Sequence, residues 1–178
     1  GAEAALSHTN SLAGSDSVVD TVLTKYNAYR AYTLDEFFDI GYACTSGLFP
    51  DGNRLGIVTI SGGVGILMSD YAVKLGVDVA RLSEAAQAKG RDVIPFAGTR
   101  NPVDITGQAV NQPEILEQCL DIMIEEGEHD VIIVYFAGMT SPEFLREAGL
   151  SRVREKHPTG AIILAIAMDH ESWKIFDD

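Results

Sequence analysis

The fold is decided by residues 54–76, which read RLGIVTISGGVGILMSDYAVKLG. The apolar, β-branched run at residues 55–60 follows the turn residues at 50–53, which is the pattern of a buried strand. Three glycines then fall within residues 62–65, and an apolar stretch with helical spacing ends at Gly76. This order predicts a strand, a tight turn and a helix that ends on a glycine.

The glycine turn is a candidate phosphate-binding site. Its members are Ser61, Gly62, Gly63, Val64 and Gly65. Glycines allow a ligand to approach the backbone, and the unpaired N–H groups and the dipole of a helix N-terminus both favour an anion. Glycines at such turns can equally serve backbone geometry alone, and the sequence leaves both interpretations open. The turn is not a standard nucleotide loop, because Met68 replaces the third fingerprint glycine and the Walker lysine is missing.

Composition and charge narrow the class of protein. The 178 residues are 46% hydrophobic and 22% charged, which fits one globular domain with an appended piece. The net charge of −13, with no cluster of Lys and Arg in the sequence, argues against a nucleic-acid partner. No signal peptide is recognisable, and the apolar run at residues 161–167 is too short to span a bilayer. We therefore expect a cytoplasmic protein without a membrane partner, in which Cys44 and Cys119 are buried, reduced thiols.

The first part of the chain predicts a loop and two helices. Residues 1–6 begin without a strand or a cap and look like a domain cut, and residues 7–16 are small and polar, as in a loop. Helices are expected at residues 17–29 and 34–46, the second starting from a capping box formed by Thr33 and Glu36. The apolar members of the second helix are expected to pack in a core; they are Phe37, Phe38, Tyr42 and Cys44.

The rest of the chain alternates strands with helices. Strands are expected at residues 77–82, 131–136 and 161–167, and helices at 84–89, 112–126 and from 142 to about 156, with residues 91–111 irregular. Strands that are continuous apolar runs between helices predict an α/β fold with a parallel sheet covered on both faces. Ligands of such sheets bind outside the carboxyl ends of the strands. Three turns meet there, at residues 61–65, 101–107 and 137–141, and in the second of them Asp104 either joins a site or only caps the loop.

Four segments together resemble a known family. Residues 7–16, SHTNSLAGSD, resemble the phosphohistidine loop of NDP-forming acyl-CoA synthetases, relatives of succinyl-CoA synthetase. ISGGVG at residues 60–65, NPVD at 101–104 and FAG at 136–138 are similar, in the same order, to the flavodoxin-like ligase domain of that family. The resemblance implies a lead-in at residues 1–53, with the loop and two helices, followed by a doubly wound, flavodoxin-like domain at 54–178.

The resemblance also implies an activity and a set of roles. The family joins a carboxylic acid to CoA at the expense of ATP, through an acyl phosphate and a phosphohistidine, and His8 stands at the position of the phosphoryl carrier. The glycine turn matches the segment that stabilises the transferred phosphoryl group, and the carboxylate of the acid substrate is placed near residues 137–139. The implied substrate-binding residues are Asn101, Asp104, Ala137, Gly138 and Met139.

The resemblance also implies cofactors and partner domains, and the sequence differs from the family motif at one position. CoA and ATP with Mg²⁺ are the implied cofactors, and a CoA-binding Rossmann domain and an ATP-grasp domain are the implied partners in a larger, oligomeric enzyme. We expect this piece to bind neither cofactor tightly and to make no acyl-CoA alone. The family usually has His-Thr-Gly in its loop, and Asn10 replaces that glycine here. Asn tolerates left-handed backbone, but the swing of the loop is put in question.

Alternatives from other classes remain. A receiver domain would need acids after its first strand, where this chain has Ile60 and Ser61, and a flavin-binding flavodoxin would need a hydroxyl-rich loop. A non-catalytic docking domain of the same fold stays open because of Asn10. His129 is interpreted as a surface residue, and the Asp169-His170-Glu171 cluster is weak evidence for a metal, so no metal site is expected.

Overall fold

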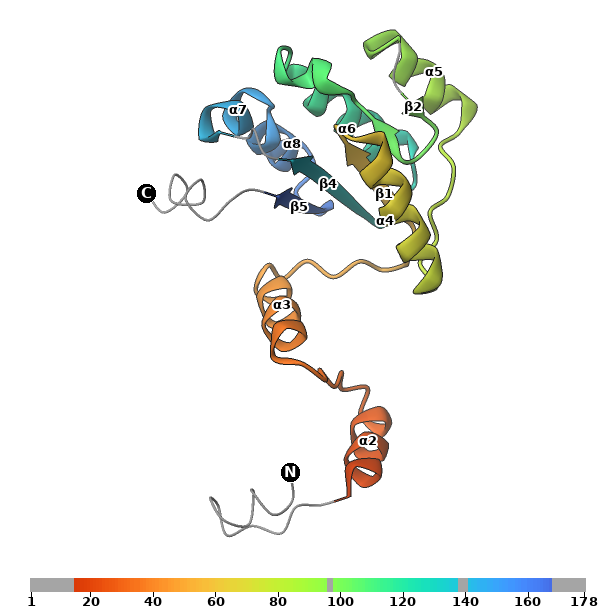
Figure 1. Cartoon of the computed structure of the whole chain (residues 1–178), viewed down its shortest axis with the longest axis vertical. Coiled ribbons are helices and arrows are strands. Elements are labelled where there is room, and N and C mark those ends of the chain that lie inside the picture. Colours follow the sequence, from red (N-terminus) through yellow and green to blue (C-terminus); the bar gives the residue numbers. More distant parts are fainter. Residues whose placement is uncertain (1–14, 96–97, 138–140, 168–178) are drawn as a thin grey trace. The chain divides into compact units, whose positions relative to one another are not determined.

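A computed structural model of the chain describes residues 15–95, 98–137 and 141–167 (Figure 1). The chain divides into two compact units, Gly1–Gly47 and Leu48–Asp178, each of which is described by itself. The first unit contributes two helices, and the second contains the sheet. The predicted loop at residues 7–14, with His8 and Asn10, lies outside the described residues.

The two predicted helices of the first unit are present as α2 (Asp16–Lys25) and α3 (Leu34–Thr45). Thr33 is the N-cap of α3, and its Oγ1 accepts a hydrogen bond from the backbone N–H of Glu36 at 3.1 Å. The Glu36 carboxylate in turn accepts from the backbone N–H of Tyr32 at 2.7 Å. The capping box therefore forms, with its return bond one residue earlier than the standard pattern.

The apolar side chains of α2 and α3 are exposed, so the prediction that those of the second helix pack in a core is wrong for the described residues. Neither helix has a buried residue, and Phe37, Phe38 and Tyr42 are 61%, 65% and 82% exposed. Cys44 is also exposed, whereas Cys119 is buried as expected. Helical spacing marks a face that suits packing, but it does not show whether that face is covered within the same unit.

The second unit is an α/β domain with a mostly parallel sheet. Its strands are β1 (Leu55–Thr59), β2 (Gly98–Thr99), β3 (Val103–Asp104), β4 (Val131–Ala137) and β5 (Ala161–Ala167). Its helices are α4 (Gly62–Lys74), α5 (Glu84–Val93), the 3-10 turn η1 (Gly107–Val110), α6 (Glu114–Glu126), α7 (Pro142–Glu147) and α8 (Leu150–Lys156). The strand order is β2-β3-β1-β4-β5, and only the β2–β3 pair is antiparallel.

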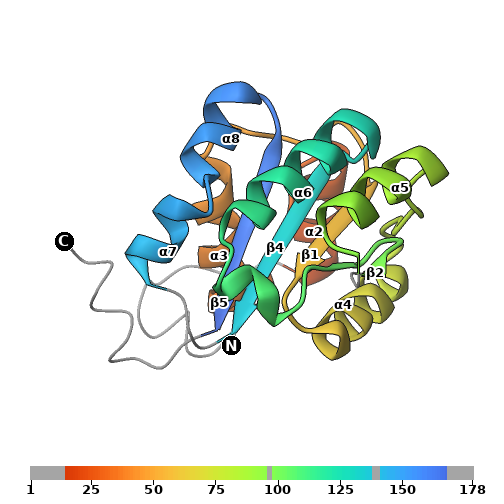
Figure 2. The same cartoon turned by 90° about the horizontal axis from the view of Figure 1, so that it is seen from above.

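Helices cover the two faces of the sheet unequally. Helices α5, α6, α7 and α8 pack on the face that carries Val58, Val134 and Phe136 (Figure 2). The opposite face, with Leu55 and Ile57, is covered by α4 through Ala72 and Met68. Each fully buried aliphatic side chain of the larger core contributes ~1.5–3 kcal/mol. The flavodoxin-like, doubly wound prediction is confirmed, although the outer strand β5 keeps Ile163 half exposed.

A side-chain amide completes the edge of the central strand. β1 pairs with β4 over five residues but with the short β3 only at Val58 and Thr59. The Asn101 amide bonds to two further backbone groups of that edge. Its Oδ1 accepts from the N–H of Ile57 at 2.9 Å, and its Nδ2 donates to the carbonyls of Leu55 at 2.9 Å and Ala80 at 2.8 Å. Asn101 has a φ of 86° and precedes Pro102 through a cis peptide bond.

The Asn101 amide also explains why the predicted strand at residues 77–82 is absent. That segment makes a single bridge, between Arg54 and Asp78, and Leu55 N–H donates to the carbonyl of Asp78 at 2.7 Å. Beyond this point the Asn101 amide occupies the hydrogen-bonding groups of β1 that a continued strand would need. The prediction of a strand there is wrong because periodicity does not reveal which side chain takes a ladder position.

Two further predictions need smaller corrections. Residues 91–111 were expected to be irregular, and they include the end of α5, the short strands β2 and β3, and η1. The helix expected from residue 142 to about 156 is broken into α7 and α8 at Gly149, whose φ of 76° is left-handed. Neither feature has a periodic signal, because two-residue strands and a single left-handed residue are too short to produce one.

His129 lies half-buried, so its prediction as a surface residue is wrong. Its Nδ1 is 3.4 Å from the carbonyl oxygen of Met123, and its Nε2 is 3.5 Å from Nδ2 of Asn101. A neutral ring that donates from Nδ1 and accepts at Nε2 satisfies both contacts. Burial, which disfavours the charged ring, lowers the pKa of His129 below its ordinary value of 6.5.

Replacing Asn101 tests the amide at the strand edge. Asn101→Ala leaves the N–H of Ile57 and two carbonyls without their partner, and we expect it to lower the free energy of unfolding by ~2–4 kcal/mol. Asn53→Ala is the matched control, because Asn53 donates one exposed hydrogen bond, to the carbonyl of Gly76. We expect the control to cost less than ~1 kcal/mol in urea unfolding. Equal costs for the two variants would contradict the role given to Asn101.

The lowered pKa of His129 predicts a pH dependence of stability. As the pH falls through 6.5, the unfolded chain takes up a proton at His129 that the folded chain does not, so the folded state loses stability. Above that pH both states are neutral at this residue, and it has no effect. We expect wild type to lose more stability than His129→Gln between pH 7.5 and pH 5.5, measured by urea unfolding. Parallel losses in the two proteins would show that His129 titrates normally.

Candidate active site

The candidate site lies at the carboxyl ends of β1 and β4. From β1 the chain crosses to β3 on one side, and from β4 it crosses to β5 on the other, so the sheet changes winding direction between β1 and β4. Doubly wound sheets bind ligands in the crevice at that point. The turn at residues 61–65 follows β1, and Ala137, an exposed residue, ends β4.

The turn at residues 61–65 leaves the start of α4 uncapped. Thr59 is fully buried, and its Oγ1 accepts from the N–H of Ser61 at 3.0 Å, which fixes the exit of β1. Ser61 is the N-cap of α4, but its side chain makes no capping bond, and the first turn has no acid. In α3, α5 and α7 the N-cap side chain does accept a backbone hydrogen bond. The first N–H groups of α4 are therefore available to an acceptor.

The three glycines of the turn have different reasons to be glycine. A Cβ on Gly65 would lie 3.0 Å from Cγ2 of Thr59 and 3.1 Å from Cβ of Pro102, so packing alone requires glycine there. A Cβ on Gly62 would lie 2.8 Å from Oδ2 of Asp104. A Cβ on Gly63 would meet nothing within 4 Å, and the residue is exposed. Close packing explains why residues 62 and 65 are glycines. Packing does not explain the glycine at residue 63, and close approach of a ligand would.

Asp104 shapes the loop beside the turn. Its Oδ1 accepts from the N–H of Thr106 at 2.9 Å, and Thr106 in turn caps η1 through its Oγ1, which accepts from the N–H of Gln108 at 3.2 Å. Thr106 has a φ of 58°, which is uncommon for a residue with a branched side chain. Asp104 therefore turns the loop, and its second oxygen also faces Gly62. A carboxylate at Gly62 confines an incoming anion to the Gly63 side of the helix end.

The remaining predicted site residues divide into two groups. Asn101 has its amide engaged with β1 and Ala80, so its role in substrate binding stays a prediction with no free polar group to support it. His8, Gly138 and Met139 lie outside the described residues, as does the Asp169-His170-Glu171 cluster. Among the predicted site residues, the structure thus brings Gly62 close to Asp104.

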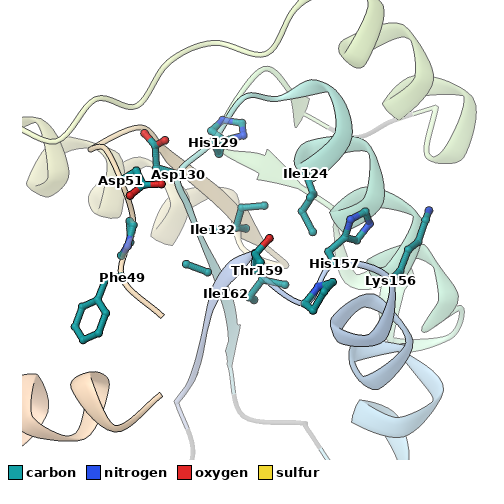
Figure 3. Close-up of a pocket in the computed structure, with 14 residues that line it drawn as sticks. Phe49, Asp51, Ile124, His129, Asp130, Ile132, Lys156, His157, Thr159 and Ile162 are labelled. Carbon is teal, nitrogen blue, oxygen red and sulfur yellow. The ribbon is translucent and has the colours of Figure 1, made fainter. Parts of the chain in front are cut away.

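A shallow hollow lies at the opposite end of the sheet. It has a volume of about 400 Å³ and is lined where β4 and β5 begin (Figure 3). Three of its titratable side chains are already engaged. Asp130 pairs with Arg54 at 3.1 Å, and its pKa lies below the usual range mainly because of that hydrogen bond. His157 and Lys156 both reach Asp121 on α6. These contacts are structural, and the other acid of the lining, Asp51, is exposed.

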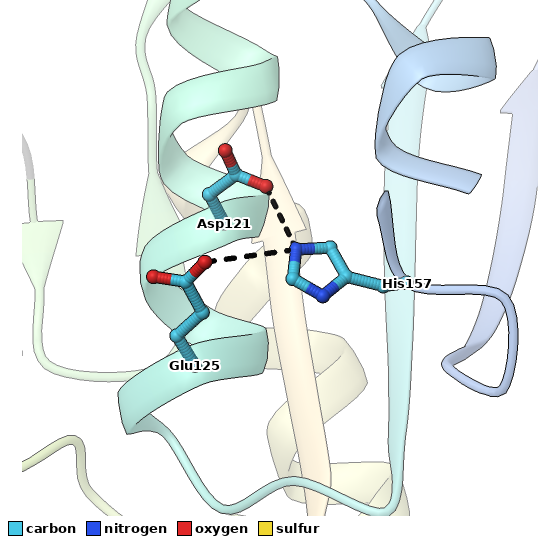
Figure 4. A group of neighbouring side chains, drawn as sticks. All are labelled: Asp121, Glu125 and His157. Carbon is cyan, nitrogen blue, oxygen red and sulfur yellow. Dashed lines mark hydrogen bonds and ion pairs between the residues drawn. The ribbon is translucent and has the colours of Figure 1, made fainter. Parts of the chain in front are cut away.

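One group of side chains has the composition of a metal site. Oxygens of Asp121 and Glu125 and a ring nitrogen of His157 lie within 4.8 Å of one another (Figure 4). His157 Nε2 is 3.0 Å from Oδ1 of Asp121, and Lys156 Nζ lies 2.8 Å from Asp121 and 2.9 Å from Glu125. The two carboxylates raise the pKa of Lys156 to about 12. The ammonium group therefore already offsets part of the negative charge of this pair, and the sequence signal for the pair is two acids at i, i+4 on a helix.

Among the helices that the structure describes, none is long and apolar enough to cross a membrane.

The fold and the open helix start at its switch point define a flavodoxin-like α/β domain of the doubly wound class. Comparison with known families makes this more specific. Residues 55–172 match the Ligase-CoA domain, and residues 1–44 match the succinyl-CoA ligase like flavodoxin domain. The chain belongs to the Ligase-CoA domain family, and the resemblance noted in the sequence is confirmed.

Characterised relatives are longer than this chain. The alpha subunit of acetate–CoA ligase (ADP-forming) I from Pyrococcus furiosus is 30% identical over 99% of the chain, which spans 38% of that protein. The 4-hydroxybutyrate–CoA ligase (ADP-forming) of Nitrosopumilus maritimus is 36% identical over 61% of the chain and 16% of its own length. The dinucleotide forming acetyl-coenzyme A synthetase 1 of Ca. Korarchaeum cryptofilum, solved with phosphate and ADP, shares the fold, with a TM-score of 0.83 at 24% identity over 99% of the chain and 38% of that chain.

Alanine substitutions separate the roles of the glycines. Gly65→Ala forces a Cβ against Thr59 and Pro102, and we expect it to lower the free energy of unfolding by ~1–3 kcal/mol. Gly63→Ala enters open space within a helix, and we expect stability to change by less than ~1 kcal/mol, toward higher stability. Urea unfolding of the two variants beside wild type measures both values. A cost for Gly63→Ala equal to that for Gly65→Ala would contradict the open surface at Gly63.

Proposed function

We propose that this chain is part of an ADP-forming acyl-CoA synthetase, in which a carboxylic acid, CoA and ATP give acyl-CoA, ADP and phosphate. The observation that carries the proposal is the match of both parts of the chain, in order, to two CoA-ligase domain families. The relatives with those families are ADP-forming CoA ligases for acids as different as acetate and 4-hydroxybutyrate. We therefore propose a small carboxylic acid as the substrate and name no particular acid.

His8 is the phosphoryl carrier in this proposal. A neutral imidazole nitrogen takes the phosphoryl group from ATP, leaving ADP, and passes it to the carboxylate of the acid; CoA then displaces phosphate from the acyl phosphate. The first N–H groups of α4, at Gly62, Gly63 and Val64, stabilise the charge of the phosphoryl group during transfer. The uncapped start of α4 and the open surface at Gly63 support this role.

Other parts of the enzyme supply the remaining chemistry. The chain spans 38% of the length of its Pyrococcus relative, and we assign CoA to a Rossmann domain and ATP with Mg²⁺ to an ATP-grasp domain, in the same chain or in a partner subunit. Ala137, Gly138 and Met139 are assigned to the substrate carboxylate, and Asn101 and Asp104 are also assigned to substrate binding. The assembly is proposed to be a cytoplasmic oligomer.

A second candidate is a non-catalytic docking domain of the same fold. Asn10, which replaces the usual glycine of the histidine loop, is the observation that favours it. Such a domain would keep the sheet and the surfaces for its neighbours without transferring phosphate. The two candidates differ in whether a phosphoryl group ever reaches His8.

Phosphate labelling of the full-length protein tests the carrier. After incubation with radiolabelled ATP, or with acyl-CoA and labelled phosphate, we expect wild type to carry an acid-labile, base-stable phosphate. His8→Ala should abolish the label, and His157→Gln, at a histidine engaged with Asp121, should retain it. Gly63→Val should slow labelling, because a branched side chain covers the N–H groups at the helix start. A wild-type protein that never acquires the label would leave the docking domain as the correct assignment.

A further inference from the structure

Three arginines line one hollow on the outer edge of the sheet. The hollow has a volume of about 360 Å³, and its arginines are Arg81, Arg91 and Arg100. Glu84 and Gln87 of α5 and Thr99 of β2 also line it. We call it the arginine hollow. It shares none of its lining residues with the turn at residues 61–65.

These three arginines differ from the others in the chain. The chain has eight arginines, and the guanidinium groups of the five outside the hollow are all engaged. Arg30 and Arg54 pair with aspartates, Arg146 and Arg152 pair with glutamates, and Arg154 donates to backbone carbonyls. Within residues 15–95, 98–137 and 141–167, the guanidinium groups of Arg81, Arg91 and Arg100 form no ion pair or hydrogen bond. The arginines without partners are thus the ones that share a hollow.

Backbone contacts hold the three positions together. The N–H of Leu82 donates to the carbonyl of Arg100 at 2.9 Å, and the Asn101 amide donates to the carbonyl of Ala80 at 2.8 Å. These two bonds tie the segment of Arg81 to the segment of Arg100. On the third side, α5 approaches β2 so closely that a Cβ on Gly90 would lie 3.0 Å from Cγ2 of Thr99, which brings Arg91 beside the strand.

The charge of the hollow is opposite to that of the chain. Three arginines and one acid, Glu84, line the hollow, in a protein with a formal net charge of −13. Like charges held close together repel one another unless a counter-charge joins them. Guanidinium groups present planar sets of donors that match phosphate oxygens. No basic cluster is recognisable in the sequence, because these residues stand nine or ten positions apart, and only the fold brings them to one hollow.

We propose that the arginine hollow binds a small molecule that carries a phosphate chain, such as the diphosphate of a nucleotide or of CoA. Its volume lies in the range of small-ligand sites, and several donors can share the charge of two phosphates. A nucleic-acid backbone is disfavoured by the acidity of the rest of the chain. The proposal does not rest on phosphoryl transfer at His8, since it concerns a different part of the surface.

Chemical modification of arginine provides a local test. The full-length protein is treated with phenylglyoxal alone and with ADP, CoA or tripolyphosphate, and the modified arginines are identified by mass spectrometry. We expect at least one probe to slow modification of Arg81, Arg91 and Arg100 by about fivefold or more, with Arg146 unchanged as the control. Protection by ADP alone or by CoA alone identifies the source of the phosphate chain. Equal rates at all three arginines with and without every probe would overturn the proposal.

Substitutions provide the second arm. In a His8→Ala background, which removes phosphoryl transfer, Arg91→Gln and Arg100→Gln should each abolish the protection of Arg81 or raise the probe concentration needed for it about tenfold. Arg146→Gln removes the same charge from a paired, exposed arginine and should leave the protection intact. Protection of Arg81 that survives both hollow substitutions unchanged would contradict a shared site. Phosphate labelling of an Arg91→Gln protein that keeps His8 separates failure of this proposal from failure of the proposed ligase activity.

Discussion

The amide of Asn101 is the interaction on which the rest of this domain depends. β1 is buried on both faces, so any polar group left unpaired along its edges has no water to bond. β4 satisfies one edge over the full length of the strand, whereas β3 reaches only the last two residues of the other. The Asn101 side chain accepts from Ile57 and donates to Leu55, which is what a backbone peptide of a longer strand would do. One side chain therefore supplies two of the hydrogen bonds that a longer neighbouring strand would make.

The same interaction positions the surfaces that we connect with function. With the edge closed at Leu55 and Ile57, β1 runs straight to Thr59, whose hydroxyl fixes Ser61 at the start of α4. Pro102, the residue after Asn101, packs where Gly65 lacks a side chain, and this contact sets how closely α4 lies against the strand. The packed strand and loop therefore fix the direction of the free N–H groups of the turn. On the other side, the bond from Asn101 to Ala80 holds the segments that carry Arg81 and Arg100.

Long periodic elements could be predicted from the sequence, and contacts between distant segments could not. The strand and helix at residues 55–74, α6, β4 and β5 were found because many residues repeat one pattern. The hydrogen bonds of Asn101 to Leu55 and Ile57 join positions more than forty residues apart, and no local pattern predicts them. For the same reason the sequence does not reveal that His129 is half-buried or that three arginines line one hollow. The sequence predicts the glycine turn between β1 and α4, but it does not say whether the glycines serve packing or the approach of a ligand. The packing at Gly65 and the open surface at Gly63 bear on that question.

Hydrogen exchange at the amide of Ile57 tests this account most directly. The N–H of Ile57 bonds to a side chain, whereas that of Ile133 lies in β4 between two paired strands. If the Asn101 amide serves as part of the sheet, the two N–H groups should exchange at similar rates, both limited by global unfolding of the domain. If the N–H of Ile57 exchanges orders of magnitude faster than that of Ile133, the edge of β1 opens locally, and the side-chain amide does not hold the structure as described.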